Sequence, residues 1–309
     1  FFFREDILVP FSYDGQEPLA SNPLIPSRGF LGKLFPKHFF QEEQQPGFPA
    51  REIRTRRRWE DLILNPRQAA ELQTVKQWMQ HKETILYDWE LADMFRPGYR
   101  VLFYGPPGTG KTFTASLLGK ELGKKVWRID LSMMVSKYIG ETEKNLARVF
   151  ALATREEHIL FFDEADALFG KRSATHSSHD RYANQEVSYL LQRIEDYSGL
   201  LILATNFKQN MDEAFIRRFE AMIHFPLPGP QQRFLLWEHA FSRGLALSPE
   251  ISLENIADTH ELSGGEIVNI LRYCANHAAA AERTEVIAEE LLQAILRENE
   301  RSGKLILRG

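Results

Sequence analysis

The chain has 309 residues, of which 43% are hydrophobic and 26% are charged, a length that gives a soft expectation of about two domains. Its formal net charge of −4 speaks against a nucleic-acid-binding protein that is basic overall. The single cysteine, Cys274, excludes a disulfide scaffold, and no apolar run approaches the roughly 20 residues of a membrane helix, so we expect a soluble cytoplasmic protein without a membrane partner.

The first 58 residues differ in composition from the rest. They contain seven prolines and a glutamine-rich patch and show no helical period, so we expect residues 1–58 to form a linker or arm that is partly extended. The chain opens at Phe1 rather than Met, and we interpret it as a fragment or a trimmed product. The arginine run between Arg51 and Arg58 indicates a solvated linker, with an acidic partner or nucleic acid as the alternative.

Residues 59–228 alternate between helical and strand patterns. Asn65-Pro66 marks a helix start. Compact apolar runs predict strands at 101–104, 126–129, 159–162, 200–203 and 222–225. Helical patterns lie between them at 113–122, 143–153 and 184–195. Nearly continuous apolar strands separated by helices predict an α/β fold, in which a parallel sheet is covered by helices on both faces.

The last third of the chain has only helical patterns. They follow a proline-rich hinge at 226–230 and cover 231–242, 253–259, 265–281 and 288–299. We therefore predict a large α/β domain at 59–228 and a small all-helical domain at 229–309.

A phosphate-binding pattern, G-x-x-x-x-G-K-[ST], lies between the first predicted strand and the next helix, where its chemistry requires it. Its residues are Gly105, Pro106, Pro107, Gly108, Thr109, Gly110, Lys111 and Thr112, and Phe113 follows at the predicted helix start. The glycines let backbone N–H groups point at phosphate oxygens, and the helix N-terminus adds positive potential. Lys111 would reach the β- and γ-phosphates and Thr112 would hold Mg²⁺, which predicts ATP and Mg²⁺ as cofactors.

Polar residues end two further predicted strands. Asp163 and Glu164 follow the run 159–162, at the sheet edge where open α/β sheets bind ligands. Asp163 there could hold Mg²⁺ through water and Glu164 could polarise the attacking water, although both could also cap a helix. Asn206 ends the next strand and could orient that water, or it could simply form a turn.

Together these motifs resemble those of the AAA+ ATPases, and within them the AAA clade, from about Trp59 to Asn299. The resemblance implies a five-stranded core sheet, a helical lid and a homo-oligomeric ring, usually of six subunits, with ATP at the interfaces. The segment 212–219 is similar to the family's arginine-finger segment, which implies that Arg217 and Arg218 reach the ATP of a neighbouring protomer. The alternative is a surface salt bridge with Glu220 or Glu213.

A second segment, His260 with residues 263–267, resembles the family's sensor-2 region. The resemblance implies that His260, Gly264 and Gly265 lie near the base or ribose of ATP. The family usually has Gly-Ala where this chain has Gly264-Gly265, and the alternative for His260 is a core histidine with a satisfied ring.

Residues 136–143 are similar to the first pore loop of protein-remodelling AAA rings. The resemblance implies that Lys137, Tyr138, Ile139 and Gly140 grip a protein substrate, with the exposed tyrosine giving a sequence-tolerant contact. The alternative is that Tyr138 and Ile139 pack beneath the following helix.

The stretch from Arg96 to Pro228 resembles the ATPases of phage-tail-like extracellular contractile injection clusters more narrowly. This implies a cytoplasmic factor for particle assembly or cargo loading, with a protein substrate or an injection-particle component as its partner. The family's inter-subunit signalling stretch, usually Asp-Gly plus an apolar residue, reads Asp196-Tyr197-Ser198 here. The leading hypothesis is therefore a protein-remodelling ATPase ring; the alternatives are an assembly scaffold that threads no substrate and, with less support, a nucleic-acid motor.

Overall fold

The computed structural model describes residues 8–10, 24–26, 50–130, 141–165, 188–206, 213–242 and 244–304. The chain divides into two compact units, residues 1–51 and residues 52–309. In the first unit, strand β1 (Leu8–Pro10) pairs antiparallel with β2 (Leu24–Pro26). All candidate site residues belong to the second unit.

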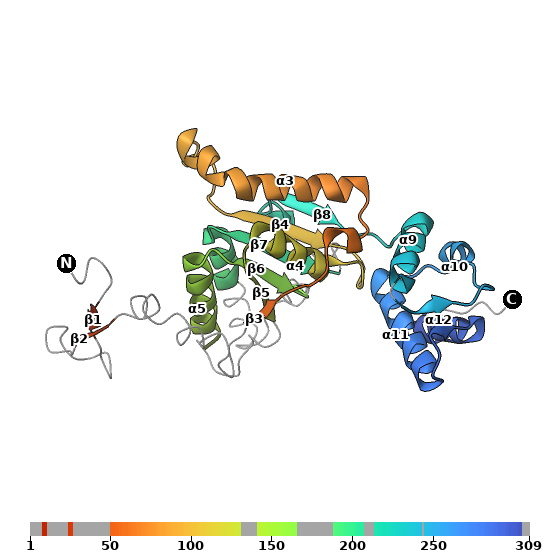
Figure 1. Ribbon diagram of the computed structural model, residues 1–309. Coiled ribbons are helices and arrows are strands. Elements are labelled where there is room, and N and C mark those ends of the chain that lie inside the picture. The colour runs from red at the N-terminus through yellow and green to blue at the C-terminus, as the bar shows by residue number, and fades with distance from the viewer. Residues whose placement is uncertain are drawn as a thin grey trace, which may run out of the picture. The chain divides into compact units, whose positions relative to one another are not determined.

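The core of the second unit is a six-stranded sheet in the order β3-β5-β6-β7-β4-β8 (Figure 1). Its strands are β3 (Ala50–Ile53), β4 (Tyr99–Tyr104), β5 (Val126–Asp130), β6 (Ile159–Asp163), β7 (Leu200–Thr205) and β8 (Ala221–His224). The pairs β5–β6, β6–β7, β7–β4 and β4–β8 are parallel, which confirms the predicted α/β class. The five predicted strands are all present, and β3 is a sixth that we did not predict. Its sequence, Ala-Arg-Glu-Ile, contains no apolar run that would predict a strand. Only its pairing at the edge of the sheet shows that it is one.

Helices cover both faces of this sheet. Alternate strand residues such as Val101 and Phe103 pack against α3 (Pro66–Glu83) and α4 (Lys111–Leu122) in one apolar cluster. Phe162 points to the opposite face, where the ring of Phe150 in α5 (Glu141–Arg155) lies 6.1 Å away. The sheet is thus the middle of three layers (Figure 1).

The start of α3 follows from its capping residues. Asn65 accepts a hydrogen bond from the Gln68 backbone N–H at 2.9 Å, and the Gln68 side chain accepts one from the Asn65 N–H at 2.9 Å. Pro66 takes the first helical position, where its missing N–H costs nothing. The helix start predicted from Asn65-Pro66 is confirmed, and α3 continues into a π-helical turn at Thr84–Asp88.

The C-terminal part contains α9 (Pro230–Phe241), α10 (Leu253–Thr259), α11 (Gly264–Ala280) and α12 (Ala288–Arg301). Two short parallel strands, β9 (Ala246–Leu247) and β10 (Glu285–Val286), add to the predicted helices. Trp237 and Cys274 lie in its own apolar cluster. The domain boundaries predicted at 58/59 and 228/229 stay a prediction, although β3 joins part of the predicted arm to the sheet. Across the described ranges, no helix combines the length and apolar character that crossing a membrane requires.

Tyr197 belongs to the core and does not project from it. Its side chain is buried, and its ring meets that of Phe150 edge-on with centroids 5.7 Å apart. The hydroxyl donates to the carbonyl oxygen of His158, and burial raises the pKa of this phenol. The stretch Asp196-Tyr197-Ser198 therefore has a structural residue at the position where the resembling family has glycine.

We predict that Tyr197→Phe lowers the free energy of unfolding by about 1 kcal/mol, because the buried carbonyl of His158 loses its donor while the ring keeps its packing. Chemical denaturation measures the change. Tyr87→Phe is the matched control, because the Tyr87 side chain is 63% exposed and its substitution should be neutral. Equal stability of the two variants would contradict a structural role for the Tyr197 hydroxyl.

Candidate active site

The loop between β4 and α4 has the backbone geometry of a phosphate cradle. Gly105, Gly108 and Gly110 have φ angles of 142°, 74° and 99°, a region that favours glycine. Gly110 is the N-cap of α4, so the helix begins at Lys111, two residues before the predicted start at Phe113. The N–H groups of the first turn of α4 therefore face the loop, as anion binding requires.

The Lys111 side chain is buried and joins the loop to the end of β7. Its ammonium donates to the carbonyl oxygens of Gly105 at 2.6 Å and Pro106 at 2.9 Å, and to Asn206 Oδ1 at 3.0 Å. The structure thus brings Lys111 and Asn206 together, and the predicted role of Asn206 in orienting water stays a prediction. Because an ammonium has three donors, a bound phosphate would take over some of these contacts.

Asp163 and Thr112 form the second contact across the site. Thr112 Oγ1 donates to Asp163 Oδ2 at 3.1 Å, so a hydroxyl from α4 and a carboxylate from β6 meet at the edge of the sheet. Magnesium prefers oxygen ligands of these two kinds. The donor set therefore fits Mg²⁺, and the glycine loop beside it fits the phosphates of a nucleotide.

Glu164 follows Asp163 in an unusual backbone conformation. Its φ angle is 53°, which costs a non-glycine residue about 1–3 kcal/mol, and its side chain is exposed. Its N–H donates to Asp163 Oδ1 at 3.1 Å, and the N–H of Ala165 donates to the Ala204 carbonyl of β7 at 3.0 Å. These two hydrogen bonds hold the turn in which Glu164 sits beside the Asp163 carboxylate.

Sequence reasoning missed two residues of this site. Arg128 of β5 has its Nε 3.2 Å from Asp163 Oδ2. Leu62 packs beside the loop: its Cδ1 lies 3.1 Å from the place that a Cβ would take on Gly110. Arg128 could have been found from the sequence, because it is a lone arginine inside the apolar run Val126–Ile129 and parallel pairing places it near the end of β6. The sequence held no comparable signal for Leu62.

Helix α11 contacts the phosphate loop directly. The Gly265 N–H donates to the Gly108 carbonyl at 2.9 Å, and Ser263 caps the helix through the backbone N–H of Glu266. A Cβ on Gly265 would lie 2.9 Å from the Cα of Gly108, closer than side chains approach, whereas one on Gly264 would make ordinary contacts. The glycine found where the resembling family has alanine thus has a steric reason.

His260 ends α10, and burial of its ring lowers its pKa. Because the usual value is near 6.5, the ring is neutral at pH 7. A neutral half-buried imidazole could contact a base or ribose but would add no charge to a phosphate site. The predicted role near the nucleotide stays a prediction.

Arg217 and Arg218 lie between α8 (Glu213–Ile216) and β8, and Arg217 is exposed. Arg218 pairs with Glu195, and its hydrogen bond lowers the pKa of that carboxyl. Glu195 also accepts from Arg96 Nη1 at 3.0 Å. The sequence alternative named Glu220 or Glu213 as the partner of this segment; instead Glu220 pairs with the buried Arg100.

The predicted pore-loop residues Lys137, Tyr138, Ile139 and Gly140 lie outside the described residues. Their role stays a prediction.

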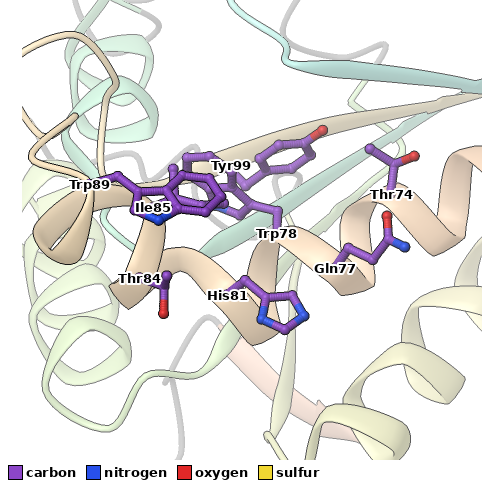
Figure 2. Close-up of a pocket in the computed structure, with 8 residues that line it drawn as sticks. All are labelled: Thr74, Gln77, Trp78, His81, Thr84, Ile85, Trp89 and Tyr99. Atoms are coloured by element: carbon purple, nitrogen blue, oxygen red, sulfur yellow. The ribbon is translucent and has the colours of Figure 1, made fainter.

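A separate pocket lies beside α3. Figure 2 shows it between the end of α3, the π-helical turn and β4, with Trp78, Ile85, Trp89 and Tyr99 supplying apolar walls. None of the residues that line it belongs to the phosphate loop or to the Asp163 contact. It therefore does not form part of the candidate nucleotide site.

Comparison with known sequences agrees with this geometry. Residues 101–227 match the family described as "ATPase family associated with various cellular activities (AAA)". This part of the chain is an AAA ATPase domain. The match runs from β4 to the segment after β8 and so contains the phosphate loop, Asp163, Glu164, Asn206 and both arginines.

Several curated proteins are similar to the chain. The 26S proteasome regulatory subunit 10B homolog of Arabidopsis thaliana is 34% identical over 209 residues, or 65% of this chain and 52% of that protein. A katanin p60 ATPase-containing protein of Mus musculus is 32% identical over 258 residues, or 78% of this chain and 50% of that protein. Cell division protein C of Sulfolobus acidocaldarius is 35% identical over 173 residues, or 52% of this chain and 46% of that protein. The chain thus spans about half the length of these relatives.

We predict that Gly265→Ala weakens nucleotide binding by about tenfold, because its Cβ forces α11 away from Gly108 at an overpacking cost of roughly 1–3 kcal/mol. Titration with a fluorescent ATP analogue measures the affinity. Gly264→Ala is the matched control, because its Cβ would have room, and its affinity should match that of the unsubstituted protein. A tenfold loss in both variants would contradict the steric explanation.

Proposed function

We propose that this chain is a Mg²⁺-dependent ATPase that works in a homo-oligomeric ring to remodel, unfold or translocate a protein substrate. The observation that carries the proposal is the convergence of Lys111 with Asn206, and of Thr112 with Asp163, at one edge of the AAA domain's sheet. This arrangement supplies contacts for both phosphate and metal. Neither a scaffold nor a nucleic-acid motor explains it better.

Each residue of the site has a chemical task in this proposal. The loop N–H groups and Lys111 bind the phosphates, and Thr112 and Asp163 hold the metal. Bound Mg²⁺ would neutralise charge that develops on the phosphate oxygens during phosphoryl transfer. Glu164 accepts a proton from the attacking water, and Asn206 orients that water between the carboxylate and the phosphate.

The ring, which we propose to be a hexamer, rests on Arg217 and Arg218. An arginine delivered across an interface stabilises transition-state charge and makes hydrolysis depend on assembly. Arg217 is exposed and needs no rearrangement to reach a neighbour, whereas Arg218 would exchange Glu195 for the neighbour's phosphate. A head-to-tail contact of this kind closes into a ring when its rotation permits.

A protein substrate is supported by two observations. One relative is named as a regulatory subunit of the 26S proteasome. The arginine run, the main argument for nucleic acid, is anchored by its backbone beside α4: Lys120 Nζ donates to the Arg57 carbonyl at 2.7 Å, and the Arg57 guanidinium lies 5.6 Å from the Phe113 ring centre. In the proposal Tyr138 and its neighbours grip the substrate. The resemblance to contractile-injection ATPases supports a cytoplasmic role in particle assembly or cargo loading.

We predict that Glu164→Gln binds ATP with unchanged affinity and loses turnover by at least about 10²-fold, because the amide cannot accept a proton. Phosphate release measures turnover. Mass photometry of this variant should show a closed ring with ATP and Mg²⁺ and the 35.8 kDa monomer without nucleotide. Turnover at the unsubstituted rate would contradict the role of Glu164, and a monomer under both conditions would contradict nucleotide-driven assembly.

We predict that Tyr138→Ala keeps the basal ATPase rate but abolishes its stimulation by an unfolded protein such as casein, because the aromatic grip on the substrate is lost. Tyr138→Phe keeps the aromatic ring of the side chain and should retain most of the stimulation by casein. Steady-state phosphate release with and without casein measures both variants. Stimulation that survives in Tyr138→Ala would contradict threading and favour the assembly scaffold.

A further inference from the structure

Asp163 has a cation beside it that the proposed reaction does not use. Arg128 lies on β5, two residues before the end of the strand, and its Nε is 3.2 Å from Asp163 Oδ2. Register explains the meeting: Arg128 pairs with Phe161, so its side chain lies on the same face of the sheet as that of Asp163, two residues further on. The Arg128 side chain is 43% exposed and that of Asp163 is 16% exposed.

This ion pair engages the oxygen that the metal site needs. Asp163 Oδ2 accepts from Thr112 Oγ1 at 3.1 Å and lies beside Arg128, while Oδ1 accepts from the Glu164 N–H. A metal held by Thr112 and Asp163, directly or through water, approaches the carboxylate on its Oδ2 side. The guanidinium and the metal therefore compete for the charge of one carboxylate.

We propose that Arg128 is a positioning residue that holds Asp163 when no metal is bound and yields it to Mg²⁺ when the nucleotide arrives. The inference rests on the proposed nucleotide site and is independent of the protein substrate. Two consequences follow from the charges. Without metal, the positive charge of Arg128 weakens the repulsion between the Asp163 carboxylate and the triphosphate. With metal, Mg²⁺ weakens that repulsion instead. Arg128 thus reduces how strongly ATP binding depends on Mg²⁺.

The measured quantity is the ratio between the dissociation constants of a fluorescent non-hydrolysable ATP analogue in EDTA and in saturating Mg²⁺. Arg128→Gln should raise this ratio about two- to fivefold, the range of a partly exposed ion pair, mainly through weaker binding in EDTA. Arg128→Met, which keeps the aliphatic stem against the sheet, should do the same. Arg128→Lys keeps the charge and should restore the ratio of the unsubstituted protein.

Arg155→Gln is the matched control. Arg155 also pairs through its Nε with a carboxylate, that of Glu156 at 2.9 Å, but it lies on α5 and the structure gives it no contact with Asp163. Its ratio should stay unchanged, which separates a local effect at Asp163 from the loss of one positive charge in the protein.

An unchanged ratio in both Arg128→Gln and Arg128→Met would overturn the inference. A raised ratio in Arg128→Lys would also overturn it, because charge would then not be the cause. Failure of the proposed function looks different: the unsubstituted protein would bind the analogue in neither condition. The same titration therefore distinguishes the two failures.

Discussion

The parallel register of the central sheet is the constraint on which the site depends. Parallel pairing brings the carboxyl ends of β4, β6 and β7 to one edge, so the phosphate loop, Asp163 and Asn206 meet although they are far apart in the chain. A shift of one residue in β6 would turn Asp163 to the other face and put Phe162 or Glu164 in its place. The buried apolar residues of the strands hold this register. The packing of the core therefore also determines where the polar residues of the site lie.

Sequence reasoning reached the parts of the site that depend on local spacing. The pattern ending in Lys111-Thr112 fixed the loop, and strand-end carboxylates indicated Asp163, because both signals need only a strand and its next turn. It did not find β3, whose four residues carry no apolar run, or Leu62, which reaches Gly110 from a distant segment. Such contacts depend on how separate segments pack, and spacing along the chain carries no record of that packing.

The arginine segment is anchored by charged contacts as well as by the packing of Phe215 against Phe219, whose ring centroids lie 5.1 Å apart. Arg100 of β4 is buried and donates to Glu220 and to the Glu195 carbonyl, while the Glu195 carboxylate receives Arg96 and Arg218. Arg100 is buried, but Glu220 is 34% exposed and Arg218 is 33% exposed, so water screens these pairs and each adds modestly to stability. Arg100 and Glu220 thus tie β4 to the residue that precedes β8, while Arg217 and the partly exposed Arg218 keep room to change partner.

The contact between Gly108 and Gly265 has a mechanical consequence. Most contacts between chain segments run through side chains, which absorb small movements by changing rotamer. Here a carbonyl and an N–H meet with no side chain between them, so neither atom moves without its own backbone. A shift of the phosphate loop therefore moves the backbone at the start of α11 directly, because no side chain between them can take up part of the movement.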